Sequence, residues 1–167
     1  VFLSHLHLDH VGWNTREERG KHVPVFPNAR YVVHQDDLDH FRKPEVQAVG
    51  RYPYIDRFIE PLAEQGILDT IPGDSDLTDE VKAIHTPGHT PGSICFLFEE
   101  SKFLAAGDTL FRGSIGRTDF PGGNYQAIER SIREQLYTLD EETTVVTGHG
   151  PPTTIGTEIR TNAFIRG

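Results

Sequence analysis

The sequence predicts a domain of mixed helices and strands, of the α/β or α+β class. Three observations support this prediction. Short apolar segments of strand length follow one another along the chain, one longer segment has the apolar spacing of a helix, and no Pro/Gly/Ser-rich linker divides the 167 residues. We therefore expect one domain, residues 1–167, which is long enough to bury a sizeable core.

The first half of the chain alternates apolar and polar segments: a buried strand is expected over residues 1–4, a loop over 11–28 and a strand over 29–34. Asp36 is then expected to cap a short helix that extends to Phe41. Residues 54–65 have the apolar spacing of a helix, and Pro61 within them predicts a kink or a weaker helix.

The second half contains four apolar segments of strand length, at residues 67–71, 81–85, 94–98 and 102–106. Residues 99–101 are expected to form a hairpin turn between the last two. The next apolar residues step by three or four positions and predict one helix: Tyr125, Ile128, Ile132, Leu136 and Leu139. A final short strand is expected at residues 145–146, before Gly148.

Composition excludes several classes of function. The net charge of −9 argues against a nucleic acid or an anionic membrane as partner. No apolar segment approaches the roughly 20 residues of a membrane span, and no signal-peptide pattern is present. The single cysteine, Cys95, lies in an apolar segment and is expected in the core. These features predict a cytoplasmic protein that acts on a small molecule.

The segment HLHLDH, residues 5–10, concentrates metal-ligand side chains. His5 and His7 alternate with Leu6, so in an extended chain they point the same way. A helix that begins just after them would turn Asp9 and His10 toward the same point. Imidazole and carboxylate groups suit zinc and similar divalent ions, and core packing rarely uses such residues. The segment therefore predicts a metal site.

Three further ligand-type residues follow strand candidates in the second half. His89 lies in HTPGHTPGS, Asp108 in AAGDTLF and His149 in VTGHGPP, each at a transition from strand to loop. Functional groups concentrate at such positions on a rigid scaffold. Five histidines and two aspartates are enough for two metals. His5 and His7 would bind one ion, Asp9 and His10 the other. His89 and His149 would complete the two sets, and Asp108 could bridge them.

The other histidines are weaker candidates. His85 is expected to support the metal site from behind its ligands or to end a strand. His22, His34 and His40 lie in polar segments and are expected on the surface.

The order and spacing of HLHLDH, TPGHT, GD and GHG resemble the metallo-β-lactamase superfamily. The resemblance implies a four-layered αββα sandwich, of α+β class, with a dinuclear site at one end of its sheets. One ion would be held by His5, His7, His89 and Asp108, and the other by Asp9, His10, His149 and Asp108. The implied cofactors are two divalent ions, zinc first, with iron or manganese as alternatives.

Two branches of that superfamily are represented. GDTLFRGSIGRTDFPGGN and GHGPPTTIGTEIRTNAF are similar to short bacterial glyoxalase II-like proteins, the hydroxyacylglutathione hydrolases. HLHLDHVGWNT and VPVFPNARYVVHQDDLDHF resemble instead the lactonase and organophosphate hydrolase branch. Lactonases often have a tyrosine where this chain has Phe111, which counts against a lactonase. Arg117 and Asp119 lie in a stretch that contacts substrate in the family; Arg117 could meet a substrate carboxylate or form an ion pair within its loop.

The first strands of the sheet normally precede the histidine cluster in this superfamily, whereas four residues precede it here. The resemblance therefore implies a domain truncated at its N-terminus. We expect an exposed sheet edge through which copies of the chain self-associate.

The leading functional hypothesis is a dinuclear hydrolase of esters or thioesters, nearest to a hydroxyacylglutathione hydrolase. Two cations would activate a water for attack on the carbonyl, with Asp9 orienting it or taking its proton and Asp108 bridging the ions. The alternatives are a lactonase or organophosphate-type metallohydrolase, a mononuclear iron persulfide dioxygenase, which shares GRTDF, and a metal-binding but inactive domain.

Overall fold

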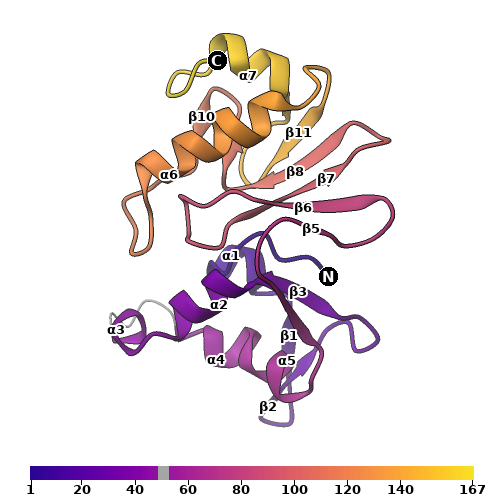
Figure 1. The fold of residues 1–167 in the computed structure, drawn as a ribbon. Coiled ribbons are helices and arrows are strands. Elements are labelled where there is room, and N and C mark those ends of the chain that lie inside the picture. The colour runs from indigo at the N-terminus through magenta and orange to yellow at the C-terminus, as the bar shows by residue number, and fades with distance from the viewer. Residues whose placement is uncertain (49–52) are drawn as a thin grey trace. The chain divides into compact units, whose positions relative to one another are not determined.

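The computed structural model describes residues 1–48 and 53–167, which form two compact units, Val1–Pro72 and Gly73–Gly167. Each unit combines helices with β-structure, so the mixed class predicted from the sequence is confirmed (Figure 1). The expectation of one domain over residues 1–167 stays a prediction.

The first unit contains two small sheets. Strands β1 (Thr15–Glu18) and β2 (Lys21–Pro24) form an antiparallel hairpin, and β3 (Tyr31–His34) pairs in parallel with β4 (Leu68–Ile71). The helices are short: α1 (Leu8–Val11), α2 (Gln35–Arg42), α3 (Pro44–Gln47), α4 (Ile55–Phe58) and α5 (Glu60–Glu64). Apolar side chains of these helices, of β3 and of the N-terminal segment form one cluster that includes Phe41, Val33 and Leu6.

Several sequence predictions for this unit need correction. Residues 1–4 do not form a full strand; Phe2 makes a single parallel bridge to Val32. The expected loop at residues 11–28 contains the β1–β2 hairpin, whose turn is made by Arg19 and Gly20, both with positive φ. The α2 helix is where it was expected, but its cap is His34 rather than Asp36: His34 Nδ1 accepts the Asp36 N–H.

The predicted helix at residues 54–65 is divided at Ile59 into α4 and α5. Pro61 lies in the first turn of α5, where a missing N–H costs no helical hydrogen bond. A proline inside a continuous helix would clash with the preceding turn, so the chain begins a new helix instead.

The second unit is built on a six-stranded mixed sheet in the order β12-β11-β8-β7-β6-β5. Its strands are β5 (Ser75–Asp76), β6 (Val81–His85), β7 (Ile94–Phe98), β8 (Phe103–Gly107), β11 (Thr144–Thr147) and β12 (Thr153–Thr154). The β7–β8 hairpin turns where it was predicted. Strands β8 and β11 run parallel, so both enter the loops that follow them at the same edge of the sheet. A separate hairpin joins β9 (Leu110–Phe111) to β10 (Ser114–Ile115).

Two helical segments lie on one side of this sheet (Figure 1). The predicted helix at residues 125–139 begins as α6 (Tyr125–Arg130), widens into a π-helical turn over Ser131–Gln135, and ends in a 3₁₀ turn over Leu136–Thr138. Its predicted stripe is fully buried at Ile128, Ile132 and Leu136 and packs on sheet residues. The helix α7 (Ile155–Thr161), capped by Thr154, was not predicted.

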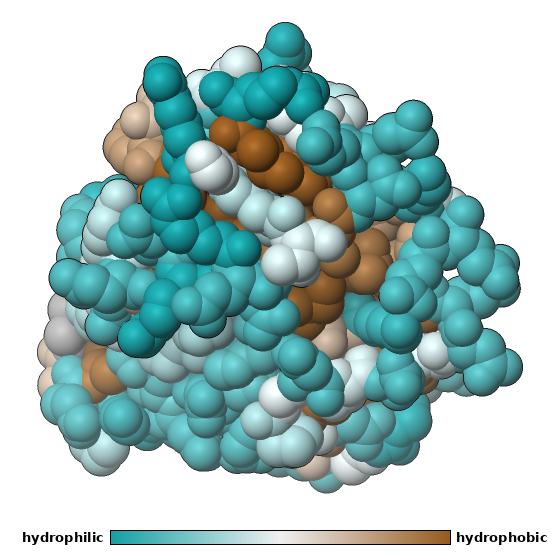
Figure 2. All heavy atoms as spheres, turned by 45° about the horizontal axis from the view of Figure 1, so that its top comes forward, coloured by the Kyte–Doolittle hydropathy of each residue, from teal (hydrophilic) through white to brown (hydrophobic). Residues whose placement is uncertain are grey.

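Hydrophilic residues cover most of the face shown in Figure 2, with a strip of hydrophobic residues among them. No helix in the described part of the chain is long and apolar enough to cross a bilayer.

Candidate metal centre

The N-terminal ligand segment brings its four side chains together around one turn of helix. His5 and His7 lie just before α1, with His7 in an extended conformation, and the turn of α1 carries Asp9 and His10. The ring centroids of His5 and His7 are 4.9 Å apart and those of His5 and His10 are 4.1 Å apart. His10 Nε2 lies 3.8 Å from Asp9 Oδ2. Within residues 1–72, the predicted gathering of these four residues is therefore observed.

The ligand side chains of this segment differ in exposure. His5 is buried. Its Nδ1 lies 3.2 Å from the hydroxyl of Ser4, so Nε2 is the ring nitrogen that does not contact Ser4. Phe41 of α2 contacts the His7 ring edge-on, with 5.7 Å between centroids. Asp9 is 58% exposed, so its carboxylate can reach a substrate or a water.

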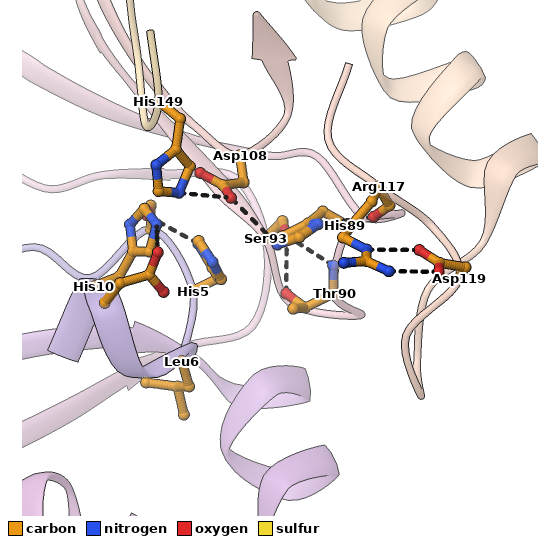
Figure 3. Close-up of polar contacts among 12 residues, drawn as sticks. His5, Leu6, His10, His89, Thr90, Ser93, Asp108, Arg117, Asp119 and His149 are labelled. Carbon is orange, nitrogen blue, oxygen red and sulfur yellow. Dashed lines mark hydrogen bonds and ion pairs between the residues drawn. The ribbon is translucent and has the colours of Figure 1, made fainter. Parts of the chain in front are cut away.

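The C-terminal candidate ligands come from three different loops of the second unit. His89 follows β6, Asp108 directly follows β8, and His149 lies just beyond β11. His89 Nε2 lies 3.6 Å from Asp108 Oδ2, and His149 Nε2 lies 3.5 Å from the same oxygen (Figure 3). One carboxylate oxygen thus faces two imidazoles that are sixty residues apart in the sequence.

These spacings fit a metal ion between each pair of atoms. Two ligand atoms that each lie about 2.1 Å from a tetrahedral zinc ion are about 3.4 Å apart. Both distances to Asp108 Oδ2 are close to that separation. The donor set of two imidazole nitrogens and one carboxylate oxygen is also what divalent ions such as zinc accept.

The tautomer of His89 is set by a backbone contact. Its Nδ1 lies 2.8 Å from the carbonyl oxygen of Arg117, which can only accept a hydrogen bond. Nδ1 therefore donates, and the lone pair of the neutral ring is on Nε2, the atom that faces Asp108. Metal-binding histidines are commonly held by such a contact on the far nitrogen. Sequence reasoning did not find this role of the Arg117 carbonyl, because a backbone acceptor leaves no signature in residue type.

Two glycines allow other backbone segments to approach Asp108 closely. A Cβ atom on Gly148 would lie 2.0 Å from Asp108 Oδ1, and one on Gly116 would lie 1.7 Å from the Asp108 carbonyl oxygen. Neither separation is possible unless neighbouring atoms shift. Because these atoms include backbone at both positions, with the Gly107 carbonyl oxygen 2.9 Å from a Cβ on Gly148, both positions favour glycine. The GHG motif therefore supplies His149 and also makes the room for the carboxylate beside it.

Arg117 and Asp119 form a bidentate ion pair in an exposed loop. Arg117 Nε and Nη2 donate to the two carboxylate oxygens of Asp119 at 2.7 and 2.6 Å (Figure 3). The guanidinium also lies 3.7 Å from the centre of the Phe120 ring. The pairing with Asp119 raises the pKa of Arg117. The loop ion pair considered from the sequence is thus present, and a contact with substrate stays a prediction.

The other histidines have structural partners. His85 ends β6 and donates from Nε2 to the Pro91 carbonyl at 2.9 Å, in agreement with the strand-end alternative. His22 Nδ1 lies 3.3 Å from the Thr15 hydroxyl. The surface prediction was wrong for His34 and His40, which are buried. His34 caps α2, a role that its polar neighbours in the sequence did not reveal.

Cys95 is a core residue, as predicted. It is fully buried in the sheet, and burial raises the pKa of its thiol to about 11, so it is protonated at neutral pH. Its sulfur lies 3.3 Å from the Thr86 hydroxyl. A protonated, buried thiol is a poor nucleophile.

Comparison with known proteins decides the family. The family model described as "Metallo-beta-lactamase superfamily" matches residues 1–149. The chain belongs to the metallo-β-lactamase superfamily. It has the α+β fold of that superfamily, as predicted, and it is a metallo-hydrolase.

Relatives with similar sequences carry related names. The chain is 36% identical over 167 residues to hydroxyacylglutathione hydrolase GloC of Haemophilus influenzae, covering 99% of this chain and 74% of that protein. It is 33% identical to the "Probable metallo-hydrolase YqgX" of Bacillus subtilis, covering 100% of this chain and 75% of that protein. The crystal structure of TTHA1623 in a di-iron-bound form matches with a TM-score of 0.73 at 32% identity, covering 98% of this chain and 76% of that one.

Proposed function

We propose that this chain is a dinuclear metal-dependent hydrolase that cleaves thioesters of the hydroxyacylglutathione type. The observation that carries the metal part is Asp108 Oδ2, one oxygen at metal-ligand spacing from both His89 and His149. The substrate class rests on the 36% identity to a hydroxyacylglutathione hydrolase and on the GHGPP segment.

The proposed ligand sets combine the two gathered groups. His5, His7, His89 and Asp108 would hold one ion, and Asp9, His10, His149 and Asp108 the other. This partition rests on the motif pattern and on the family, and each group is separately consistent with it. Zinc is the proposed metal. Iron and manganese are alternatives, since the ligands accept several metals and a related protein binds two irons.

Divalent ions in such a site acidify water and polarise a carbonyl group. The residues of the chain supply orientation and proton handling. His89 is held in one tautomer by the Arg117 carbonyl. The Asp108 side chain, only 10% exposed, presents a fixed oxygen to both imidazoles. The exposed Asp9 is the proposed group that orients the attacking water or takes its proton.

Arg117 and Asp119 are the proposed substrate contacts. Glutathione carries carboxylates, and a guanidinium binds such groups through two parallel hydrogen bonds. The Arg117 fork now holds Asp119 in this geometry at the protein surface. A substrate carboxylate would compete for the same donors.

The lactonase alternative has weaker support. The position of the tyrosine found in many lactonases is occupied by Phe111, whose ring lies 6.2 Å from that of His149, edge to face. A phenyl ring cannot donate a hydrogen bond to a developing oxyanion.

The test combines metal analysis with a substrate panel: S-lactoylglutathione, an acyl homoserine lactone, an aryl phosphotriester and a glutathione persulfide. We expect about two metal ions per chain and the highest kcat/KM with the thioester. One iron per chain with oxygen consumption on the persulfide would instead establish a dioxygenase. Two metals with turnover of the lactone or phosphotriester alone would contradict the proposed substrate class.

A further inference from the structure

Leu6, the residue between the ligands His5 and His7, is held at both of its backbone polar groups by side chains from distant segments. Its N–H donates to Asp37 Oδ2 at 3.0 Å, and its carbonyl accepts the hydroxyl of Tyr54 at 3.0 Å. The Leu6 N–H belongs to the peptide that joins it to His5, and its carbonyl to the peptide that joins it to His7. Both peptide units between the two ligands are thus fixed.

The carboxylate that makes the first contact is in an unusual place. Asp37 lies in the first turn of α2 and is fully buried, whereas Asp36 and Asp39 of the same helix are exposed. Burial of a carboxylate is costly unless hydrogen bonds compensate for the lost water. The exposed Asp36 already places a negative charge at the N-terminal end of α2. Helix stability alone therefore does not account for the burial of Asp37.

The same face of α2 supports the next ligand. Phe41 lies one helical turn after Asp37, and its ring contacts the ring of His7. The N-terminal segment is hydrogen-bonded to β3 at Leu3, whose N–H donates to the Val32 carbonyl. Residues 5–7 lie outside the described strands. Side-chain contacts with Leu6 therefore take the place of a strand ladder in fixing this part of the chain.

We propose that Asp37 and Tyr54 are positioning residues that preorganise His5 and His7 for metal binding. The inference rests on the proposed metal centre and adds two residues to it. Without the two contacts, the peptides on both sides of Leu6 rotate more freely, and metal binding must order them. Partners of this kind typically change metal affinity by about 10- to 100-fold when they are removed.

The experiment compares the metal affinities of the wild-type chain and five variants, by competition for Zn²⁺ with a chromophoric chelator. We expect Asp37→Ala to weaken binding about 10-fold or more, and Tyr54→Phe about 3- to 10-fold. The controls are Asp39→Ala, an exposed carboxylate on the same helix, and Tyr125→Phe, a partly exposed tyrosine in α6. Both should bind Zn²⁺ within about 2-fold of wild type.

A purely structural role predicts a different result. Asp37→Ala and Tyr54→Phe would then lower the Tm of the metal-free protein and leave metal affinity unchanged, which would overturn the proposal. Asp37→Asn retains an oxygen that can accept the Leu6 N–H and should recover part of the lost affinity. The visible spectrum of bound Co²⁺, which depends on ligand geometry, should change in Asp37→Ala and not in Asp39→Ala.

Two outcomes separate this proposal from the proposed function. If Asp37→Ala does not fold, Tyr54→Phe, which removes one oxygen atom, decides by its affinity alone. If the wild-type chain binds Zn²⁺ but hydrolyses no thioester, the proposed substrate class fails, while the affinity ratios of the variants still support or overturn the positioning role.

Discussion

The two groups of ligand residues are assembled in different ways. The N-terminal group comes from six consecutive positions, and its geometry is set by local backbone: the segment before α1, which ends with the extended His7, and one turn of α1. The C-terminal group comes from three loops separated by about twenty and forty residues, and its geometry is set by the strands that precede the loops. The first group depends on contacts that fix a short peptide, the second on the order of strands in a sheet.

The difference predicts how each group should tolerate substitution. In the C-terminal group, parallel pairing of β8 and β11 places Asp108 and His149 at the same sheet edge, and backbone atoms of Gly107 and Gly148 are hydrogen-bonded at 2.7 Å. In the N-terminal group, the peptides of Leu6 are fixed by single side chains. We therefore expect replacement of glycines to disturb the geometry of the C-terminal group most. Substitution of side chains around α2 should disturb the geometry of the N-terminal group.

The largest expected effect tests whether Asp108 serves both ions. Asp108→Ala should lower thioester kcat by about 1,000-fold or more and reduce bound metal below two per chain. Asp9→Ala removes a ligand of one proposed ion and should have a smaller effect on metal content. Steady-state kinetics and elemental analysis measure both, with the exposed Asp79→Ala as control. An equal loss of metal in Asp9→Ala and Asp108→Ala would contradict the bridging role.

Replacement of a glycine in the C-terminal group should have the next largest effect. In Gly148→Ala the new methyl group would collide with Asp108 Oδ1, so we expect Zn²⁺ affinity to fall about 100-fold. Gly73→Ala is the matched control, because a Cβ there meets nothing within 4 Å. Chelator competition compares the two. Wild-type affinity in Gly148→Ala would mean that the strand edge is more adaptable than the static geometry indicates.

The third effect concerns the only thiol, which lies in the C-terminal sheet. Burial raises the pKa of Cys95 from 9.0 to about 11, so the folded state holds its proton more tightly than the unfolded state does. The stability from this difference is fully present below pH 9 and is lost as the pH rises through 11. It amounts to about 2 to 3 kcal/mol.

Urea unfolding between pH 7 and 11 measures this dependence. Cys95→Ala should be less stable than wild type at pH 7, because it leaves a small cavity, but its stability should fall less steeply with pH. Parallel pH dependences of the two proteins would show that the thiol does not account for the alkaline loss.

The smallest expected effect concerns the exposed pair of Arg117 and Asp119. Loss of an exposed ion pair costs at most about 1 kcal/mol of stability. If the pair only shapes its loop, Arg117→Ala, Asp119→Ala and the double variant should have the same KM for S-lactoylglutathione. If Arg117 binds the substrate carboxylate, Arg117→Ala should raise KM about 10-fold and Asp119→Ala should not. A double-mutant cycle on KM separates the two roles.

Most residues of the candidate site could be predicted because metal binding depends on residue types, which the sequence shows directly. HLHLDH was expected to need only strand alternation and one helical turn to bring its side chains together; the helical turn is observed and the rings of His5 and His7 lie 4.9 Å apart, although residues 5–7 form no strand. His89, Asp108 and His149 could be found because each follows a strand candidate. Their grouping around one oxygen depends on the order β11-β8-β7-β6, which no local pattern reveals.

The parts that the sequence did not reveal depend on contacts over long distances in the chain. The burial of Asp37 and His34 could not be inferred from VVHQDDLDHF. In this segment buried polar residues lie beside exposed residues of the same kind, such as Asp36 and Asp39. The hairpin at residues 15–24 was missed because Arg19 and Gly20 make its turn among charged residues. The helix predicted at residues 125–139 followed from apolar spacing, which does not register a single widened turn such as the π-helical turn over Ser131–Gln135. The predicted self-association through a sheet edge stays a prediction.

The close approach of Gly116 and Gly148 to Asp108 has a consequence for how tolerance to mutation is mapped in this chain. In a saturation screen scored by growth or turnover, these two positions should be as intolerant as the histidines, although neither has a side chain that could take part in a reaction. Three other glycines would separate intolerance caused by crowding from intolerance caused by backbone angle. A Cβ at Gly73, Gly20 or Gly113 would meet nothing within 4 Å, and of these three only Gly20 and Gly113 have positive φ. Such a map would identify the positions around the Asp108 carboxylate at which the fold has no room for a side chain.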